Sequence, residues 1–415
     1  MRRTILHCDL NCFFASVELR EHPELKNLPV AVCGDPGSRH GIILAKNEAA
    51  KAFGIQTAET VWQARKKCPG LLLLPPHHQK YRDVSSTVNA LYREYTDRVE
   101  PFGVDESWLD VTAQLPALGC SGRELADTLR RRLREELGLT ISVGVSFNKV
   151  FAKLGSDYKK PDATTVIDPE DVPKIVWPLP AGAMLFVGKA TQRMLEPYGV
   201  RTIGDLAHFD PSSLEALLGK QGRQLYEYAN GLDRDPVALA GMDAAPKSVG
   251  SGTTFSHNLT TWEEVKAGAA ILCDNVAMEL RKGSLVCRTL QVTLRDPKFK
   301  DTCRQRPLPT PSQFARELID GALKLLKDCW KPGTPIRALT VTAQNLQNQA
   351  DAFEQVSLFP SDCVAPTRAK QARLETAMDS IRAKYGKKAI RFSSGDKLLE
   401  RGQEKEDQCT RESEG

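Results

Sequence analysis

The sequence predicts a multidomain α+β protein whose first half contains a ferredoxin-like sheet. Its 415 residues exceed what one hydrophobic core usually supports, so we expect two to four domains. Short β-type runs alternate with helical patterns up to residue 167, which is typical of an α+β unit. Prolines then interrupt the chain and a helix-rich segment follows, which indicates a separate all-α domain.

Composition and charge narrow the classes of protein without naming a function. The net charge of +5 and the pI near 8.5 permit nucleic-acid binding but do not require it. The mean hydropathy is -0.35, and there is neither an apolar run near the length of a membrane span nor a signal-peptide pattern. The 11 cysteines show no CxxC pair and no zinc-type spacing. We therefore expect a cytoplasmic monomer with reduced thiols and no membrane contact.

The first 76 residues predict one strand and then a small α/β insertion. The expected elements are a strand, a helix, two strands and a helix, at residues 4–8, 11–20, 30–33, 42–45 and 46–53. Gly54 is suited to close the last of these helices. Asp9 follows the first strand directly, so an acidic side chain lies at the C-terminal edge of that strand.

Residues 76–167 predict the remainder of the α+β unit. We expect a helix, a pair of short strands, a helix, a strand, a helix and a final strand, at residues 79–96, 98–111, 123–137, 140–146, 148–157 and 164–167. The strand pair turns near Gly103. Asp105 and Glu106 therefore lie close to that turn.

The rest of the chain predicts further units. An all-α domain, a linker, a unit of helices and strands, and a helix in the tail are expected at residues 183–228, 235–246, 249–346 and 367–385. Within the third of these, residues 290–294 and 339–342 are β-type runs. From Ser394 onward the chain is charged and poor in apolar residues, which is typical of disorder.

Three acidic residues converge if the strand that ends at Asp9 pairs with the strand that begins near Asp105 and Glu106. Clusters of carboxylate oxygens hold hard divalent cations such as Mg²⁺ together with substrate phosphates. Two such ions can stabilise both the attacking and the leaving oxygen of an in-line displacement. Each acid taken alone is better explained as a turn or cap residue, so the interpretation depends on its neighbourhood.

Four motifs together resemble the Y-family DNA polymerases, in particular the DinB or DNA polymerase IV branch. They are DLNCFFASVE at residues 9–18, DES at 105–107, GVSFNK at 144–149 with its continuation to Pro161, and KSVG at 247–250. Each motif is weak alone, but the combination is specific and spans residues 1 to about 346.

The resemblance implies a right-hand polymerase with a ferredoxin-like palm, small fingers, a helix-hairpin-helix thumb and an α/β little finger. The expected bounds are palm 1–10 and 76–167, fingers 11–75, thumb 168–236, linker 237–246, little finger 247–348 and tail 349–415. The implied activity is template-directed, low-fidelity DNA synthesis without proofreading, as in translesion synthesis. Primer-template DNA and deoxynucleoside triphosphates are the implied partners.

The same resemblance implies the roles of the acids. Asp9, Asp105 and Glu106 match the catalytic carboxylates, and the carbonyl of Leu10 completes a site for two Mg²⁺ ions, with Mn²⁺ as an alternative. Phe14 matches the steric gate that excludes ribonucleotides. Helical periodicity alone fits Phe13 and Phe14 equally well as core residues, so only the family match separates them.

The resemblance further implies a nucleotide site formed by Phe13, Phe14, Ile42, Lys51 and Lys160. This chain departs from the family there. Ala45, Glu48 and Lys51 stand where a Thr, a Tyr and an Arg often hold the phosphates. Lys51 supplies a charge without a bidentate fork, and Glu48 cannot donate to a phosphate. Ile42, at the roof of the new base pair, is larger than is common in the family.

Contacts with DNA and with a sliding clamp are also implied. The turn that begins at Phe186, where the family usually has Gly, is expected to bind a DNA phosphate through Val187, Gly188, Lys189 and Thr191. Basic residues of the little finger, among them Arg288, Arg295 and Arg304, are expected to bind the DNA backbone. The peptide QVSLF resembles a clamp-binding motif through Gln355, Ser357, Leu358 and Phe359.

Two other interpretations remain open from the sequence. A nucleotidyl cyclase on the same type of sheet would share the strand-end Asp and the hairpin acids, although the thumb-like and clasp-like domains argue against it. A DNA- and clamp-binding accessory protein would explain Glu48 in the phosphate site. The intact trio of Asp9, Asp105 and Glu106 argues against that loss of catalysis.

Overall fold

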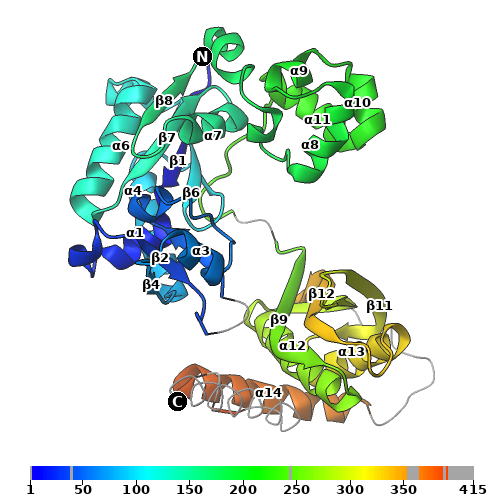
Figure 1. The fold of residues 1–415 in the computed structure, drawn as a ribbon. Coiled ribbons are helices and arrows are strands. Elements are labelled where there is room, and N and C mark those ends of the chain that lie inside the picture. Colours follow the sequence, from blue (N-terminus) through cyan, green and yellow to red (C-terminus); the bar gives the residue numbers. More distant parts are fainter. Residues whose placement is uncertain (1, 38–40, 243–244, 353–363, 387–388, 391–415) are drawn as a thin grey trace. The chain divides into compact units, whose positions relative to one another are not determined.

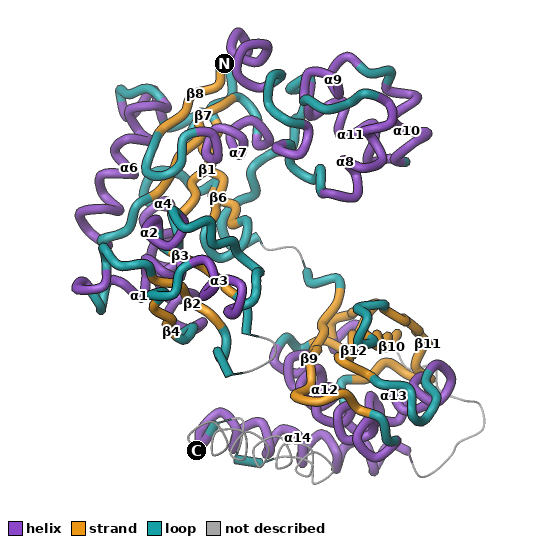
Figure 2. The backbone as a smooth tube through the Cα atoms, viewed as in Figure 1, coloured by secondary structure: helices purple, strands orange, loops and turns teal. Residues whose placement is uncertain are grey.

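The computed structural model describes residues 2–37, 41–242, 245–352, 364–386 and 389–390. The chain forms two compact units, Met1–Asp243 and Ala244–Gly415, and each is described by itself. The first unit contains a five-stranded sheet, a three-stranded sheet and a helical segment, and the second contains a four-stranded sheet with helices (Figures 1 and 2). No helix among the described residues is long and apolar enough to cross a membrane.

The main sheet of the first unit has the strand order β5-β6-β1-β7-β8. Its strands are β1 (Ile5–Leu10), β5 (Val99–Pro101), β6 (Glu106–Asp110), β7 (Ile141–Ser146) and β8 (Thr164–Ile167). The central strand β1 is buried along its whole length and runs antiparallel to both β6 and β7. The β1–β6 pairing that the sequence analysis required for convergence of the three acids is therefore present.

Helices cover both faces of this sheet. The helices of this part of the chain are α4 (His78–Arg93), α5 (Leu115–Leu118), α6 (Gly122–Leu137) and α7 (Lys149–Tyr158). On one face, α4 and α6 contribute Tyr81, Leu129 and Leu133 to a core with Leu6 and Cys8 of β1. On the other face α7 lies directly on the strands, because a Cβ added at Gly144 would meet the Ala152 carbonyl oxygen at 1.9 Å.

The insertion between β1 and α4 forms its own small sheet, in the order β3-β2-β4. Its elements are α1 (Phe13–Leu19), η1 (Pro23–Leu25), β2 (Val30–Cys33), β3 (Ile43–Lys46), α2 (Glu48–Lys51), α3 (Val61–Lys67) and β4 (Leu72–Leu74). The helix expected over residues 46–53 is wrong in its start and length. Lys46 belongs to β3, and the Asn47 side chain accepts from the Ala50 and Val30 N–H groups, which fixes α2 as one short turn.

The helix-rich segment is part of the first unit. It comprises η2 (Pro169–Asp171), η3 (Val172–Val176), η4 (Ala181–Ala183), α8 (Lys189–Leu195), η5 (Glu196–Tyr198), α9 (Ile203–His208), α10 (Pro211–Leu218) and α11 (Lys220–Ala229). Its hydrophobic core includes Val150, Phe151 and Leu154 of α7. The expected helical elements are present, and their core is shared with α7 of the main sheet.

The second unit is an antiparallel sheet in the order β11-β10-β12-β9 with helices on one face. Its elements are β9 (Ser248–Leu259), α12 (Trp262–Lys282), β10 (Leu285–Arg295), β11 (Asp301–Ser312), α13 (Ala315–Cys329), β12 (Ile336–Asn348) and η6 (Gln349–Asp351). Pro307, Pro309 and Pro311 lie on β11, an edge strand, where a missing N–H is tolerated.

The tail helix α14 (Val364–Tyr385) is bound to this second unit by ion pairs. Arg281 of α12 pairs with Glu375 and, through its Nε atom at 2.6 Å, with Asp379. Arg382, which is 6% exposed, pairs with Asp274 at 2.6 Å. The helix that the sequence analysis expected in the tail is therefore present, and it is a packed part of the second unit.

Candidate active site

The register between β1 and β6 places the acids of the candidate site. Asp9 lies directly opposite Glu106 in the antiparallel pair, and the Leu10 N–H donates to the Asp105 carbonyl at 3.0 Å. Because side chains alternate along a strand, Asp9 points to the same face of β1 as His7, toward α7. Asp9, Leu10, Asp105 and Glu106 thus meet at one strand edge.

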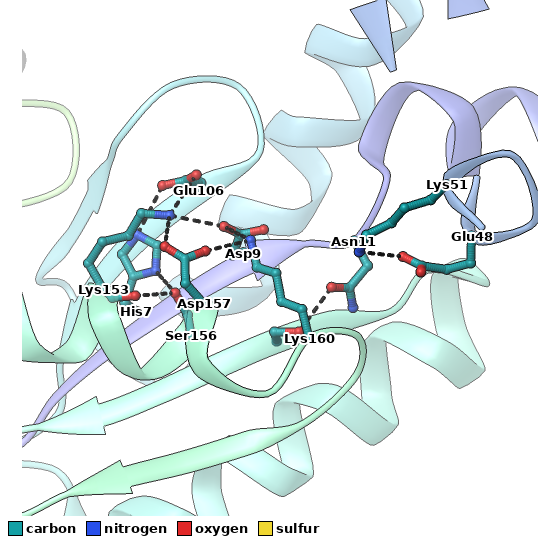
Figure 3. A network of polar contacts seen from close by, with 11 residues as sticks. His7, Asp9, Asn11, Glu48, Lys51, Glu106, Lys153, Ser156, Asp157 and Lys160 are labelled. Atoms are coloured by element: carbon teal, nitrogen blue, oxygen red, sulfur yellow. Dashed lines mark hydrogen bonds and ion pairs between the residues drawn. The ribbon is translucent and has the colours of Figure 1, made fainter. Parts of the chain in front are cut away.

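Two lysines of the same region contact these carboxylates (Figure 3). The Lys153 ammonium lies 3.2 Å from Asp9 Oδ2 and 2.9 Å from Glu106 Oε1. The Lys160 ammonium lies 2.6 Å from the same Asp9 oxygen, and both lysines also contact Asp157. The negative charge at this strand edge is therefore large enough to hold two cationic groups.

The environment separates the pKa values of the three acids. Burial, together with the charges of Asp9 and Glu106, raises the pKa of Asp105 to about 6. For Glu106, burial alone would raise the pKa. The contact with His7 and the charge of Lys153 have the larger effect and lower the pKa of Glu106 to about 2. Burial raises the pKa of Asp9 against the opposing charges of Lys160 and Lys153.

Sequence reasoning missed His7, which is fully buried beside the acids. Its Nε2 lies 3.2 Å from Glu106 Oε2, and its Nδ1 lies 2.8 Å from the Ser156 hydroxyl, which donates to the Lys153 carbonyl. Burial lowers the pKa of His7, although the contact with Glu106 opposes that shift. His7 and Glu106 therefore lie in close contact, without the geometry of a hydrogen bond between them. The alternation along β1 was the signal that could have found it.

The donor set suits a hard divalent cation. All the ligating atoms offered are oxygens, from three carboxylates and the Leu10 carbonyl, and the site already attracts cations. Among the residues that the structure describes, no three His, Cys, Asp or Glu side chains are drawn together tightly enough to form a ready metal cage. The lysine ammonium groups lie between the acids instead.

The structure separates Phe13 from Phe14, which periodicity could not. Phe13 is 3% exposed and lies in the hydrophobic core, so only its backbone is free to meet a nucleotide. Phe14 is partly exposed and stacks on Tyr81, with ring centroids 4.0 Å apart. The Tyr81 hydroxyl donates to Glu18 at 2.5 Å, and this hydrogen bond holds the Tyr81 ring in place. Sequence reasoning missed Tyr81, which supports the Phe14 ring.

Where the triphosphate is expected to bind, two charged side chains of α2 pair with each other. Lys51 Nζ lies 3.5 Å from Glu48 Oε1, which also accepts from the Cys12 thiol at 3.4 Å. Both charged side chains are about half exposed. Ile42 is 37% exposed and forms an antiparallel bridge with Thr60.

Comparisons with known proteins agree with this geometry. Models described as the impB/mucB/samB family, its C-terminal domain and the "DNA polymerase-iota, thumb domain" match residues 8–157, 246–358 and 186–233. The chain is 43% identical to a protein named DNA polymerase IV from Acetivibrio thermocellus, over 94% of this chain and 97% of that one.

The chain belongs to the DinB-like Y family of DNA polymerases. It is also 36% identical to DNA polymerase IV 1 of Bacillus subtilis, over 94% of this chain and 92% of that one. Its fold resembles that of a Dbh–Dpo4 Y-family polymerase chimera, with a TM-score of 0.71, 22% identity, and coverage of 82% of this chain and 98% of the other. Palm, fingers, thumb and little finger are accordingly the names used for its parts.

The thumb turn has a strained residue at the position where the family usually has glycine. Phe186 has φ = 68° and is 52% exposed, and the left-handed conformation costs a non-glycine residue about 1–2 kcal/mol. Val187 is buried, so only its backbone can reach a phosphate. Gly188 precedes α8, and Lys189 is exposed.

The three arginines expected to bind DNA do not share one face of the little finger. Arg295 lines a shallow cavity of about 500 Å³ on the open face of the sheet, among Ser, Thr and Gly residues of β9 and β12, and pairs with Asp301 at 2.7 Å. Arg304 lies opposite the core residue Val292, so it points to the helix-covered side. Arg288 is exposed and donates to Gln347. The open face is therefore hydroxyl-rich, with one arginine that is already paired.

The expected clamp-binding motif of Gln355, Ser357, Leu358 and Phe359 lies outside the described residues. Its flanking elements, η6 and α14, both belong to the second unit.

Proposed function

We propose that this protein extends a DNA primer across damaged template bases by two-metal nucleotidyl transfer at Asp9, Asp105 and Glu106. The observation that carries the proposal is the register between β1 and β6. It places Asp9 opposite Glu106, and the Leu10 N–H donates to the Asp105 carbonyl. The chain that shows this register belongs to the Y family. Template-directed primer extension tests it.

The proposed chemistry assigns each side chain one task. Bound at the carboxylates, two Mg²⁺ ions, or Mn²⁺ in their place, would supply charge stabilisation to the attacking and leaving oxygens. Asp9, Asp105, Glu106 and the Leu10 carbonyl would hold the ions, and His7 lies beside Glu106. Lys160 would exchange its 2.6 Å contact with Asp9 for the triphosphate, as a point-charge partner.

Phe14 is proposed as the steric gate. It stacks on the fixed ring of Tyr81, so it cannot easily retreat from a ribose 2′-hydroxyl. We expect Phe14→Ala to reduce discrimination against ribonucleotides by about 10–200-fold, the range that one steric contact provides. Single-nucleotide insertion with matched deoxy- and ribonucleoside triphosphates measures it. Phe53→Ala, which removes a 52% exposed ring of the fingers, is the matched control. Unchanged sugar selectivity in Phe14→Ala would show that Phe14 is not the steric gate.

Low fidelity and low processivity are part of the proposal. The described elements are all accounted for by palm, fingers, thumb, little finger and α14, which leaves no proofreading exonuclease domain within these residues. Location in the cytoplasm is proposed alongside, supported by nine unpaired cysteines among the described residues, and we propose that the protein acts as a monomer.

A sliding clamp is the proposed partner of residues 355–359. A short peptide that follows the last folded strand can dock in pockets of a partner through alternate side chains. We expect Leu358→Ala with Phe359→Ala to abolish stimulation of extension by the clamp and to leave basal extension unchanged. Ser361→Ala, just beyond the motif, is the control. Retained stimulation in the double variant would make the motif accidental.

A further inference from the structure

The fingers expose one aromatic side chain to an unusual degree. Trp62, in the first turn of α3, is 70% exposed, more than any other large apolar side chain among the described residues. A tryptophan is the largest apolar surface that a side chain offers, and leaving it in water forgoes the stabilisation of burial. Its neighbours Val61 and Ala64 are buried in the core of the fingers, so the helix itself is firmly seated.

The charge around this indole is positive. The Lys66 ammonium lies 5.7 Å from the centre of the Trp62 ring, and Arg65 is exposed beside it. Neither Arg65 nor Lys66 has a carboxylate partner within the described part of the chain. Lys67, by contrast, is occupied by Glu59 at 2.5 Å and by the Gly54 carbonyl at 2.8 Å. One face of α3 thus combines an open aromatic plane with two unneutralised cations.

This face is tied to the proposed nucleotide site. Thr60, the N-cap of α3, forms the antiparallel bridge with Ile42, the residue that the family resemblance implies for the roof of the new base pair. The Val61 N–H donates to the Gly41 carbonyl at 3.1 Å, and the Ile43 N–H to the Glu59 carbonyl at 2.9 Å. These two hydrogen bonds make up the bridge, and they hold the start of α3 at a fixed place relative to Ile42.

We propose that Trp62, Arg65 and Lys66 form a stacking site for an unpaired template base that has not yet reached the active site. An indole face stacks on any base, and adjacent cations pair with the phosphates that link such bases. Single-stranded template fits this chemistry, because duplex DNA hides its base faces inside the stack. The proposal rests on the DNA polymerase function and adds to it a site in the fingers for the template strand ahead of synthesis.

The test compares a short overhang, in which the templating base is the last nucleotide, with a long overhang of ten further nucleotides. Fluorescence anisotropy gives DNA affinity, and single-nucleotide insertion gives kcat and KM. For the natural chain we expect tighter binding to the long overhang. For Trp62→Ala that advantage should fall by about 5–100-fold, the range for loss of one base–aromatic stack, while insertion on the short overhang is unchanged. Trp62→Phe should retain most of the advantage, and Phe53→Ala should keep all of it.

A companion variant tests the cations. Arg65→Gln with Lys66→Gln should lower the dependence of long-overhang affinity on salt, with a change in the slope of log K against log salt of about 1 to 1.5. The proposal is overturned if Trp62→Ala keeps the overhang advantage, or if it loses insertion equally on both templates. If the natural chain binds DNA but inserts no nucleotide, the proposed polymerase function is wrong. The anisotropy measurements on the two overhangs would still show whether Trp62 binds the template strand.

Discussion

Asp105→Asn is expected to abolish primer extension and, at the same time, to make the metal-free protein more stable. Loss of one carboxylate ligand should cost at least about a hundredfold in rate, since even partners behind the ligands of a metal site cost about 10–100-fold. The stability gain follows from the raised pKa of about 6: burial and two neighbouring acids disfavour the charged form of Asp105 in the folded protein.

The size of this gain in stability depends on pH. A carboxyl group whose folded pKa lies above its unfolded value costs stability that grows as pH rises from about 4 through 6. At pH 8 without divalent cations, Asp105→Asn should therefore raise the free energy of unfolding by about 1–3 kcal/mol, and near pH 4 the difference should vanish. Denaturant unfolding in the presence of a chelator measures it.

A matched variant separates the loss of a negative charge in general from its loss at position 105. Asp83 is an exposed acid of α4 whose side chain accepts from Gln79 at 2.8 Å, so Asp83→Asn should change neither extension nor stability. Residual extension near the natural rate in Asp105→Asn would contradict its proposed role. A loss of stability at pH 8 would contradict the account of its electrostatic environment.

Glu375→Ala is expected to detach α14 from the little finger. Glu375 is 3% exposed, pairs with Arg281, and accepts from the N–H of Ala315 at 3.1 Å at the start of α13. Removal of the Glu375 carboxylate leaves the Ala315 N–H without that acceptor and leaves Arg281 with Asp379 as its acidic partner, which costs about 1–3 kcal/mol. Hydrogen exchange should show loss of protection at the Ala315 amide and along α14. Leu374→Ala, one residue away and 59% exposed, is the control and should leave exchange unchanged; unaltered protection in Glu375→Ala would show that the ion pair does not hold the helix.

Local patterns predicted much of the fold. Strands at residues 30–33 and 164–167 were predicted with the bounds that the structure has, because runs of β-branched and apolar residues end at clear turn signals. The α2 helix was predicted too long, since the decisive contact is the Asn47 side chain on the Val30 amide of another strand. Strand β4 and helix α3 were not predicted as separate elements.

The candidate site was likewise predictable only in part. The convergence of Asp9 with Glu106 could be predicted because one strand pairing determines it. The roles of Tyr81 and His7 could not, because they depend on contacts with Phe14 and Ser156, which lie 67 and 149 positions away. The docking of α14 was missed for the same reason: Arg281 and Glu375 are 94 positions apart, and each alone is indistinguishable from a solvated charge.

Primer extension tests the central claim most directly. The natural chain, a primed template and deoxynucleoside triphosphates with Mg²⁺ are combined on undamaged and abasic templates, with each triphosphate supplied alone to read template dependence. We expect the templated nucleotide to be added on undamaged DNA and synthesis to continue past the abasic site, with both activities lost in Asp105→Asn. DNA binding without any extension by the natural chain would contradict the polymerase function and favour a DNA- and clamp-binding accessory protein.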